Sequence, residues 1–225
     1  SELPFRLPLS ATASRVTGVG DAAGELLRNV RIEGAILVTE RQIVADDLVV
    51  RSDRVRGLLS VIYDLSTGHY QAGVDGAIDR SYIPGFGTVD LRADIDVRPG
   101  PGGQFSLAGR AQGRVRSLEN TTVANLAGGL PRFQANISYG ANGRFGFSDL
   151  RISAPDLSFT GSGHLNPDGT IYVTGSGSQA QYGDIRLTAQ GNASRPRLAL
   201  ALANPLPSAG IANVEAQLDP TAEGY

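Results

Sequence analysis

Three consecutive segments of this chain repeat one pattern in which apolar and polar residues alternate. Leu157–Gly163, Ile171–Gly177 and Ile185–Gly191 begin 14 residues apart, and each reads apolar, any, apolar, any, small, any, glycine. A period of two is that of a β-strand with one buried face. Asn166–Gly169 and Gln181–Asp184 separate the three segments and are rich in residues that reverse a chain. The repeats therefore predict an antiparallel meander with one apolar face and one polar face.

The same alternation runs through most of the remaining sequence. It predicts strands at Leu3–Ala13, Val30–Val38, Ile43–Val50, Gly57–Leu65, Tyr70–Ile78, Val89–Val97, Phe105–Val115, Phe133–Tyr139, Phe145–Ala154, Leu198–Leu202 and Val214–Leu218. Asp46–Asp47 interrupts the period and predicts a bulge, and the parity slips again between Phe147 and Leu150. Short helices are predicted at Asp21–Arg28 and Leu118–Gly129, and a loop at Ser81–Gly87.

The number of strands constrains the fold. About a dozen strands with one apolar face cannot remain a flat sheet, because that face would expose more than the few hundred Å² that a soluble protein tolerates. Two short helices cannot cover it. We therefore predict an all-β fold, in which a curled antiparallel meander forms a taco-shaped trough or a flattened tube with an apolar interior. Inward glycine and alanine residues, such as Gly161, Gly175 and Ala189, are expected to leave room inside and to ease bending.

Composition excludes several classes of function. The net charge of the 225 residues is −2, so there is no general attraction to nucleic acid, and no nucleic-acid partner is expected. The absence of Cys excludes disulfides and thiolate metal sites. The longest apolar run, Leu198–Ala203, is far shorter than the roughly 20 residues of a membrane-spanning helix. Because the sequence also has no Met, we expect a single elongated segment over 1–225 cut from a longer protein, with a division into 1–80 and 81–225 as the alternative.

No motif in the sequence predicts catalysis, a cofactor or a metal. His69 falls in a turn and His164 at an outward strand position, and neither has neighbours suited to a metal or a catalytic triad. Asp46–Asp47 lacks further oxygen ligands at calcium spacing, so a bulge is favoured there. Gly18–Gly24 has one residue too many for a dinucleotide fingerprint. We therefore expect a protein that is not an enzyme.

The inward positions are the candidate functional residues, because a long apolar surface can accommodate an acyl chain. Burying a chain from water contributes about 0.8 kcal/mol per methylene, whereas the same burial is nearly neutral relative to a bilayer, so a trough could pass lipid along without trapping it. The predicted groove lining comprises Leu91, Ile95, Leu107, Ile137, Leu157, Phe159, Ile171, Val173, Ile185, Leu187, Leu198 and Leu200. The alternative is a structural or adhesive β-solenoid scaffold with a closed, packed core and protein partners.

Several segments of the C-terminal half resemble the TamB proteins of Gram-negative bacteria, within the wider AsmA-like group. The resemblance is carried by Thr160–Gly169, Tyr182–Gly191, Arg195–Leu202 and Val214–Gly224, whereas Val30–Val97 is similar in texture only. It implies a long periplasmic β-structure with a hydrophobic interior, anchored in the inner membrane by an N-terminal helix. It also implies a role in outer-membrane assembly and in phospholipid movement between the two membranes.

The usual partner of such proteins is an outer-membrane barrel of the Omp85 type. This chain contains neither the anchor nor a clear terminal signature, so the resemblance places it as an interior segment of its parent. The anchor would then lie outside this chain, and contact with the barrel would be made through the parent protein.

Overall fold

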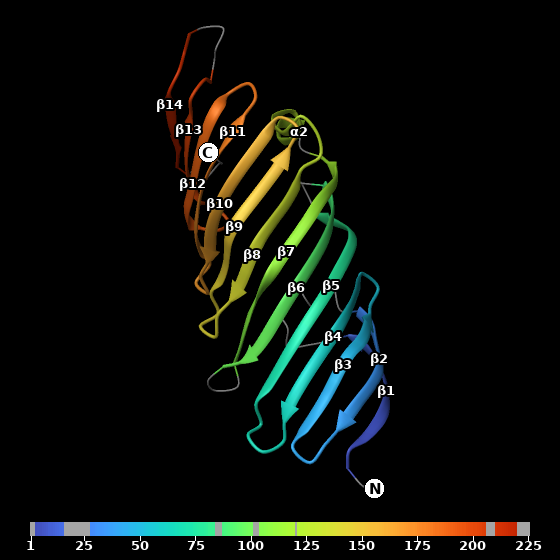
Figure 1. The fold of residues 1–225 in the computed structure, drawn as a ribbon. Helices are drawn as coiled ribbons and strands as arrows, with labels where there is room; N and C mark the ends of the chain where they lie inside the picture. Colours follow the sequence, from blue (N-terminus) through green and yellow to red (C-terminus); the bar gives the residue numbers. More distant parts are fainter. Residues whose placement is uncertain are drawn as a thin grey trace. The chain divides into compact units, whose positions relative to one another are not determined.

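A computed structural model describes residues 3–15, 28–83, 87–100, 104–119, 121–205 and 210–219 of the chain. The described residues form strands β1 (Phe5–Arg15), β2 (Arg28–Val38), β3 (Gln42–Arg51), β4 (Val55–Asp64), β5 (Tyr70–Ile83), β6 (Gly87–Pro99), β7 (Phe105–Leu118), β8 (Arg132–Tyr139), β9 (Phe145–Ala154), β10 (Leu157–Leu165), β11 (Thr170–Gln179), β12 (Gly183–Asn192), β13 (Arg197–Leu202) and β14 (Val214–Leu218), with helix α2 (Thr121–Ala127) between β7 and β8 (Figure 1).

The strands follow the chain order in a 14-stranded sheet, so the predicted all-β meander is confirmed. Each pair of neighbours whose register is defined is antiparallel. β1 and β14 end the order, so the sheet has two edge strands and does not close on itself. Pro8 lies in edge strand β1, where a missing backbone donor is tolerated.

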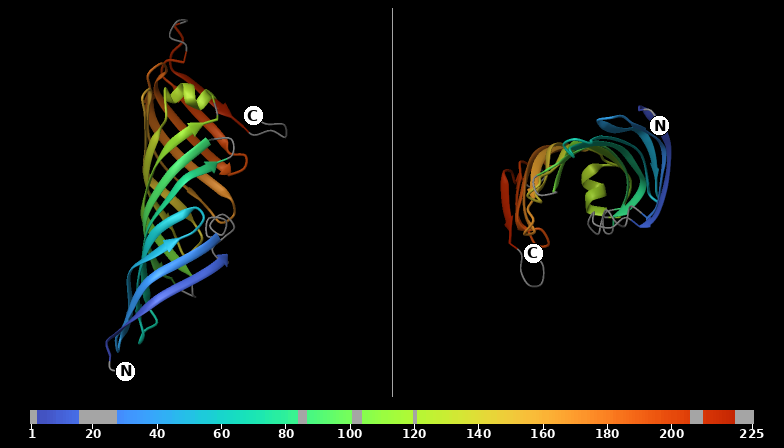
Figure 2. Two further views of the ribbon diagram at one scale, coloured as in Figure 1. Left: turned by 90° about the vertical axis from the view of Figure 1, so that its right-hand side faces the viewer. Right: turned by 90° about the horizontal axis from the view of Figure 1, so that it is seen from below.

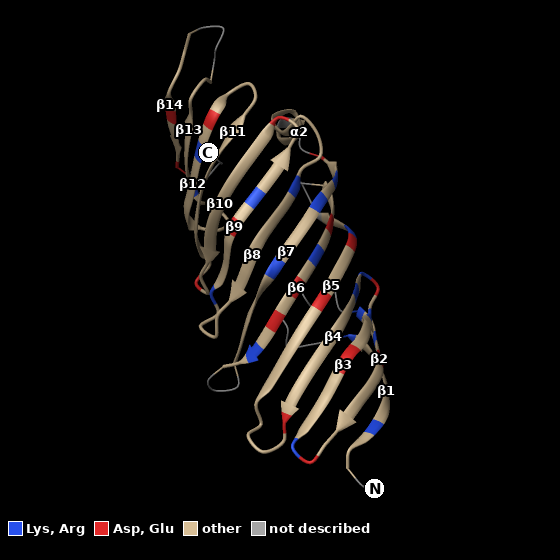
Figure 3. Ribbon diagram, viewed as in Figure 1, with Lys and Arg blue, Asp and Glu red and all other residues tan. Residues whose placement is uncertain are grey.

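Contacts divide the chain into two compact units. Unit 1 comprises Ser1–Ser81 and Asp90–Arg110, and unit 2 comprises Tyr82–Val89 and Ala111–Tyr225. In both units the strands form one bent layer (Figure 2). Charged residues occur along the strands of both units, with a dense set on β6 and β7 (Figure 3).

The register in unit 1 places apolar residues side by side on one face. One such row crosses four strands through Val38, Ile43, Tyr63 and Tyr70. The opposite face carries most of the charged residues, but it also exposes Leu37, Leu58 and Ile62.

Two bulges keep the apolar face continuous where the sequence period breaks. The pairing of β3 with β4 shifts between Ala45 and Leu48, and Asp47 there has a positive φ of 53°. Both Ala45 and Leu48 are buried, each with 4% of its surface exposed. In a regular strand Leu48, three residues after Ala45, would point to the polar face, and the bulge returns it to the apolar face. The slip after Phe147 is likewise a bulge, with Asp149 at a φ of 51°.

The helices and loops differ in part from the sequence predictions. α2 is shorter than the predicted segment, because Leu118 still belongs to β7. β5 extends to Ile83 and β6 begins at Gly87, so strands enter the segment predicted as a loop. The predicted helix at 21–28 lies outside the described residues except for Arg28, which begins β2.

Glycines on the apolar face of unit 2 do not leave the free space that we predicted. A Cβ added to Gly175 would lie 2.3 Å from Cζ of Phe159, and one added to Gly163 would lie 2.8 Å from Cζ of Phe147. The phenylalanine rings therefore cover the glycines of neighbouring strands, an arrangement that compensates for a missing side chain. At Gly177 the neighbouring backbone approaches instead, with Ser158 O at 2.0 Å from the added Cβ. This close approach is consistent with the predicted easing of bending.

We predict that Gly175→Ala destabilises the protein by about 1–3 kcal/mol, because the methyl group displaces the Phe159 ring and meets the Thr160 carbonyl oxygen. The measurement is the free energy of unfolding in urea. Gly73→Ala in β5 is the control, since nothing lies within 4 Å of the added Cβ. It is expected to be neutral or to stabilise by up to about 1 kcal/mol. Equal losses for the two variants would contradict this account of the glycine.

The turn between β4 and β5 depends on the Asp64 carboxylate. Its Oδ1 accepts hydrogen bonds from the Ser66 hydroxyl at 2.6 Å and from the backbone N–H groups of Ser66 and Thr67, each at 2.9 Å. These bonds, led by that from the Ser66 hydroxyl, lower the pKa of Asp64 from 3.8 to about 2. The charged form therefore stabilises the turn.

Because the folded-state pKa of Asp64 is depressed, its contribution to stability is complete above about pH 4 and is lost as the pH falls toward 2. We predict that Asp64→Asn lowers the midpoint of thermal unfolding at pH 6 and flattens its decline between pH 4 and pH 2. Asp75→Asn, which changes an exposed carboxylate on β5, is the control. An unchanged pH profile in Asp64→Asn would exclude this role.

Candidate functional site

One face of β8–β14 in unit 2 is lined by apolar residues, and we call it the apolar face. Its side chains align in four cross-strand rows. The first contains Phe133, Ile152, Phe159, Gly177, Ile185, Leu202 and Val214. The second contains Leu150, Gly161, Gly175, Leu187, Leu200 and Ala216. The third contains Ile137, Phe147, Gly163, Val173, Ala189, Leu198 and Leu218. The fourth contains Tyr139, Phe145, Leu165, Ile171 and Gly191.

Nine of the predicted lining residues lie on this face. Eight occur in the four rows, and Leu157 lies opposite Gln179 just before the first row. Leu187 and Leu200 are direct cross-strand neighbours, whereas Phe159 and Ile185 are separated by Gly177. The remaining three, Leu91, Ile95 and Leu107, belong to unit 1. On β6, Leu91 and Ile95 alternate with exposed charged residues, which agrees with the predicted parity, and Leu107 lies on β7.

All twelve predicted lining residues are half-buried. This distinguishes them from the interior of an ordinary globular domain, where core side chains are largely enclosed. Among the described residues, fully buried apolar side chains are sparse, and they include Val30, Val89 and Val115. The inward side chains therefore contact their neighbours within the sheet, and the rest of their surface is accessible to solvent.

Sequence reasoning omitted several residues of the apolar face. Phe147, Leu150 and Ile152 lie in its rows, but the bulge at Asp149 hides their common orientation in the sequence. The slip in parity was the signal, because a bulge returns the later residues to the same face.

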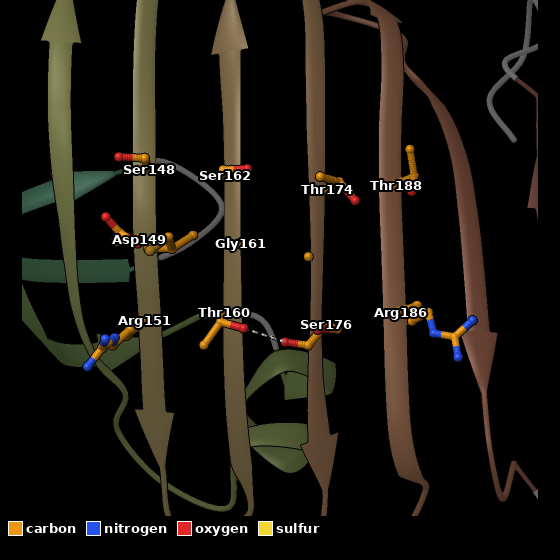
Figure 4. A pocket seen from close by; sticks show the side chains of 12 residues that line it. Ser148, Asp149, Arg151, Thr160, Gly161, Ser162, Thr174, Ser176, Arg186 and Thr188 are labelled. Atoms are coloured by element: carbon orange, nitrogen blue, oxygen red, sulfur yellow. Dashed lines mark hydrogen bonds between the residues drawn. The ribbon is translucent and has the colours of Figure 1, made fainter.

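One end of the apolar face is covered by α2. The backbone N–H of Asp156 donates to the Ala127 carbonyl at 2.9 Å, and the Gln179 side chain donates through Nε2 to the Leu126 carbonyl at 3.2 Å. Ala127 is fully buried and Gln179 is 5% exposed. The helix lies on the side of the sheet away from the polar side chains (Figures 2 and 4). Sequence reasoning missed this contact, although Gln179 is a polar residue at an inward position.

The opposite, polar face of β9–β12 carries a shallow hollow of about 770 Å³. Its side chains come mainly from Ser and Thr, with Arg151 and Arg186 at its two sides (Figure 4). Thr160 donates from Oγ1 to the Ser176 carbonyl at 3.3 Å. Farther along this face, the rings of His164 and Tyr172 lie 5.9 Å apart at 31°. These are the contacts of a hydrated strand surface.

The described residues contain no group of three or more His, Asp or Glu side chains placed to hold a metal ion. His69 is exposed in its turn, and His164 lies on the polar face, as predicted. Within the same described ranges, none of the helical segments has the length and apolar character needed to cross a membrane.

No protein-family model, curated protein or solved structure matches this chain. The resemblance to TamB proteins therefore stays a prediction, and the function is inferred from the residues and their geometry.

We predict that Leu187→Asp leaves the chain folded, because a carboxylate at this half-buried position can reach water. The expected loss is about 1–2 kcal/mol, from the apolar contact removed. Ala189→Asp is the matched variant on the same strand and face, where only 8% of the side chain is exposed. It is expected to cost roughly 3–5 kcal/mol, because the charge would be buried without a partner. Circular dichroism during thermal unfolding measures both. Equally severe unfolding in Leu187→Asp would indicate a closed, packed interior.

Proposed function

We propose that this chain shields the acyl chains of phospholipids along the apolar face of its sheet. The observation that carries the proposal is that successive rows of apolar side chains cross β8–β14 and, apart from the buried Ala189, stay half-buried or exposed. Water contact with such a face is unfavourable by about 25 cal/mol per Å². An acyl chain laid on it would remove that contact and would leave the fold unchanged.

The chemistry of the face suits hydrocarbon better than a ligand with polar groups. Its four rows contain aliphatic, aromatic and glycine residues, with the Tyr139 hydroxyl as their one polar side-chain group. Small-molecule sites usually combine apolar walls with a few polar groups that fix orientation. A surface without such groups can accept acyl chains of different phospholipids.

The resemblance to TamB proteins supports a more specific proposal. In this proposal the chain is a periplasmic segment of a longer protein anchored in the inner membrane, and it supports phospholipid transport between the two membranes and outer-membrane biogenesis. An Omp85-type barrel would be a partner of the parent protein, and the segment would act without catalysis or a cofactor. The scaffold alternative requires a closed, packed core, which the half-burial of the inward residues disfavours.

The decisive experiment compares adjacent residues of β11 that point to opposite faces. A photo-crosslinking amino acid at Val173 is expected to capture phospholipid from vesicles, whereas the same group at Thr174 is not, because Thr174 lines the polar hollow. Captured lipid is identified by mass spectrometry of the irradiated protein. Equal capture at the two positions would exclude the apolar face as the lipid site.

A further inference from the structure

The two ends of the apolar face in unit 2 differ in how far their residues are exposed. At the end held by α2, Ala127 has no exposed surface and Gln179 is 5% exposed. At the other end, Phe145 is 38% exposed and Leu165 is 39% exposed. The end of the apolar face near Leu157 is therefore covered by α2, and we call it the roofed end. The fourth row, with Phe145 and Leu165, is exposed, and we call it the open end.

At the roofed end, the buried Gln179 amide is not available to a lipid headgroup. The Gln179 amide uses Nε2 on the Leu126 carbonyl and Oε1 on the backbone N–H groups of Gln181 and Tyr182, at 2.6 and 2.8 Å. No buried side-chain N or O atom among the described residues lacks a hydrogen-bond partner. A phosphate placed under α2 would lose its water without gaining a donor from Gln179, which is strongly unfavourable.

The open end provides the setting that a headgroup requires. The rows end there beside the turns Gly140–Gly143 and Asn166–Gly169, which expose polar residues. Arg144 is exposed and directly precedes Phe145 at this end, and Arg132 is exposed and directly precedes Phe133 at the roofed end, so the two ends differ in the exposure of their rows and not in cationic charge. A phosphate could remain hydrated here while its acyl chain lies on the rows.

The length between the two ends matches one acyl chain. Phe159 and Leu165 mark the first and last rows on β10, and six residues of strand extend about 20 Å. One leaflet of a bilayer has a hydrocarbon thickness of about 15 Å, half of the roughly 30 Å core. A chain entering from the open end would therefore place its methyl end near α2.

We infer that α2 orients the bound lipid, with the methyl end of the acyl chain at Leu157 and the headgroup at Phe145 and Leu165. The inference rests on the proposed function. It adds that lipid enters and leaves unit 2 at the β10–β11 turn, since α2 and its hydrogen bonds to Asp156 and Gln179 obstruct the other end.

Because the chain contains no Trp, a single introduced Trp reports one position without background. The test uses Leu157→Trp at the roofed end and Phe145→Trp at the open end, each in the full chain. The probes are phosphatidylglycerol vesicles that contain a phospholipid with a nitroxide quencher either near the acyl carboxyl or near the methyl end. Tyr172→Trp is the control, because Tyr172 lies on the polar face and is 42% exposed. Circular dichroism verifies that each variant is folded.

We expect the methyl-end quencher to cause the greater loss of fluorescence in Leu157→Trp, and the carboxyl-end quencher the greater loss in Phe145→Trp. The same ratio of losses in both variants, or the reverse order, would overturn the orientation while leaving the lipid site in place. Quenching in neither variant beyond that of Tyr172→Trp would overturn the proposed function itself, and the orientation with it.

Discussion

The structure depends on one imbalance: strands with an apolar side and a polar side form a single layer in each unit. Hydrocarbon side chains on one side can meet only their neighbours within the sheet, so residues such as Leu187 and Leu200 stay half-buried. Bending brings them closer together and reduces their contact with water. The bend in turn requires glycines where neighbouring backbones approach, as at Gly177 beside Ser158.

The period of two was sufficient to predict the class of fold, the order of the hairpins and the bulge at Asp46–Asp47, and it marked the second bulge as a slip in parity. It was sufficient because a one-residue slip would reverse the face of every later side chain, so the sequence must mark each departure, as it does at Asp46–Asp47. The space left free beside the inward glycines could not be predicted in the same way. A glycine appears as empty space in the sequence, but register places the Phe159 ring over Gly175 and the Phe147 ring over Gly163. Which ring covers which glycine depends on cross-strand pairing, which a local pattern does not contain.

The candidate site was predictable to the extent that it follows from parity. The nine predicted lining residues of unit 2 lie on the apolar face and are half-buried, because parity alone determines the face of a strand residue. The covered end was not predictable, since it depends on a contact between Gln179 and Leu126, which are 53 residues apart. A polar residue at an inward position nevertheless indicates that a partner must reach it, because a buried amide without hydrogen bonds is costly. Gln179 was the available sign that another element covers the face at that point.

Half-burial also determines what such a face can do with a lipid. A deep, enclosed cavity would hold an acyl chain tightly and release it slowly, because leaving would expose both surfaces to water. On an open face, a chain exchanges one hydrocarbon environment for another when it moves to or from a bilayer, and the free energy changes little. The rings over Gly163 and Gly175 fill the depressions that would otherwise hold the chain at fixed points. On the proposed function, a surface of this kind would favour passage over storage, and the covered end would give that passage a direction of entry.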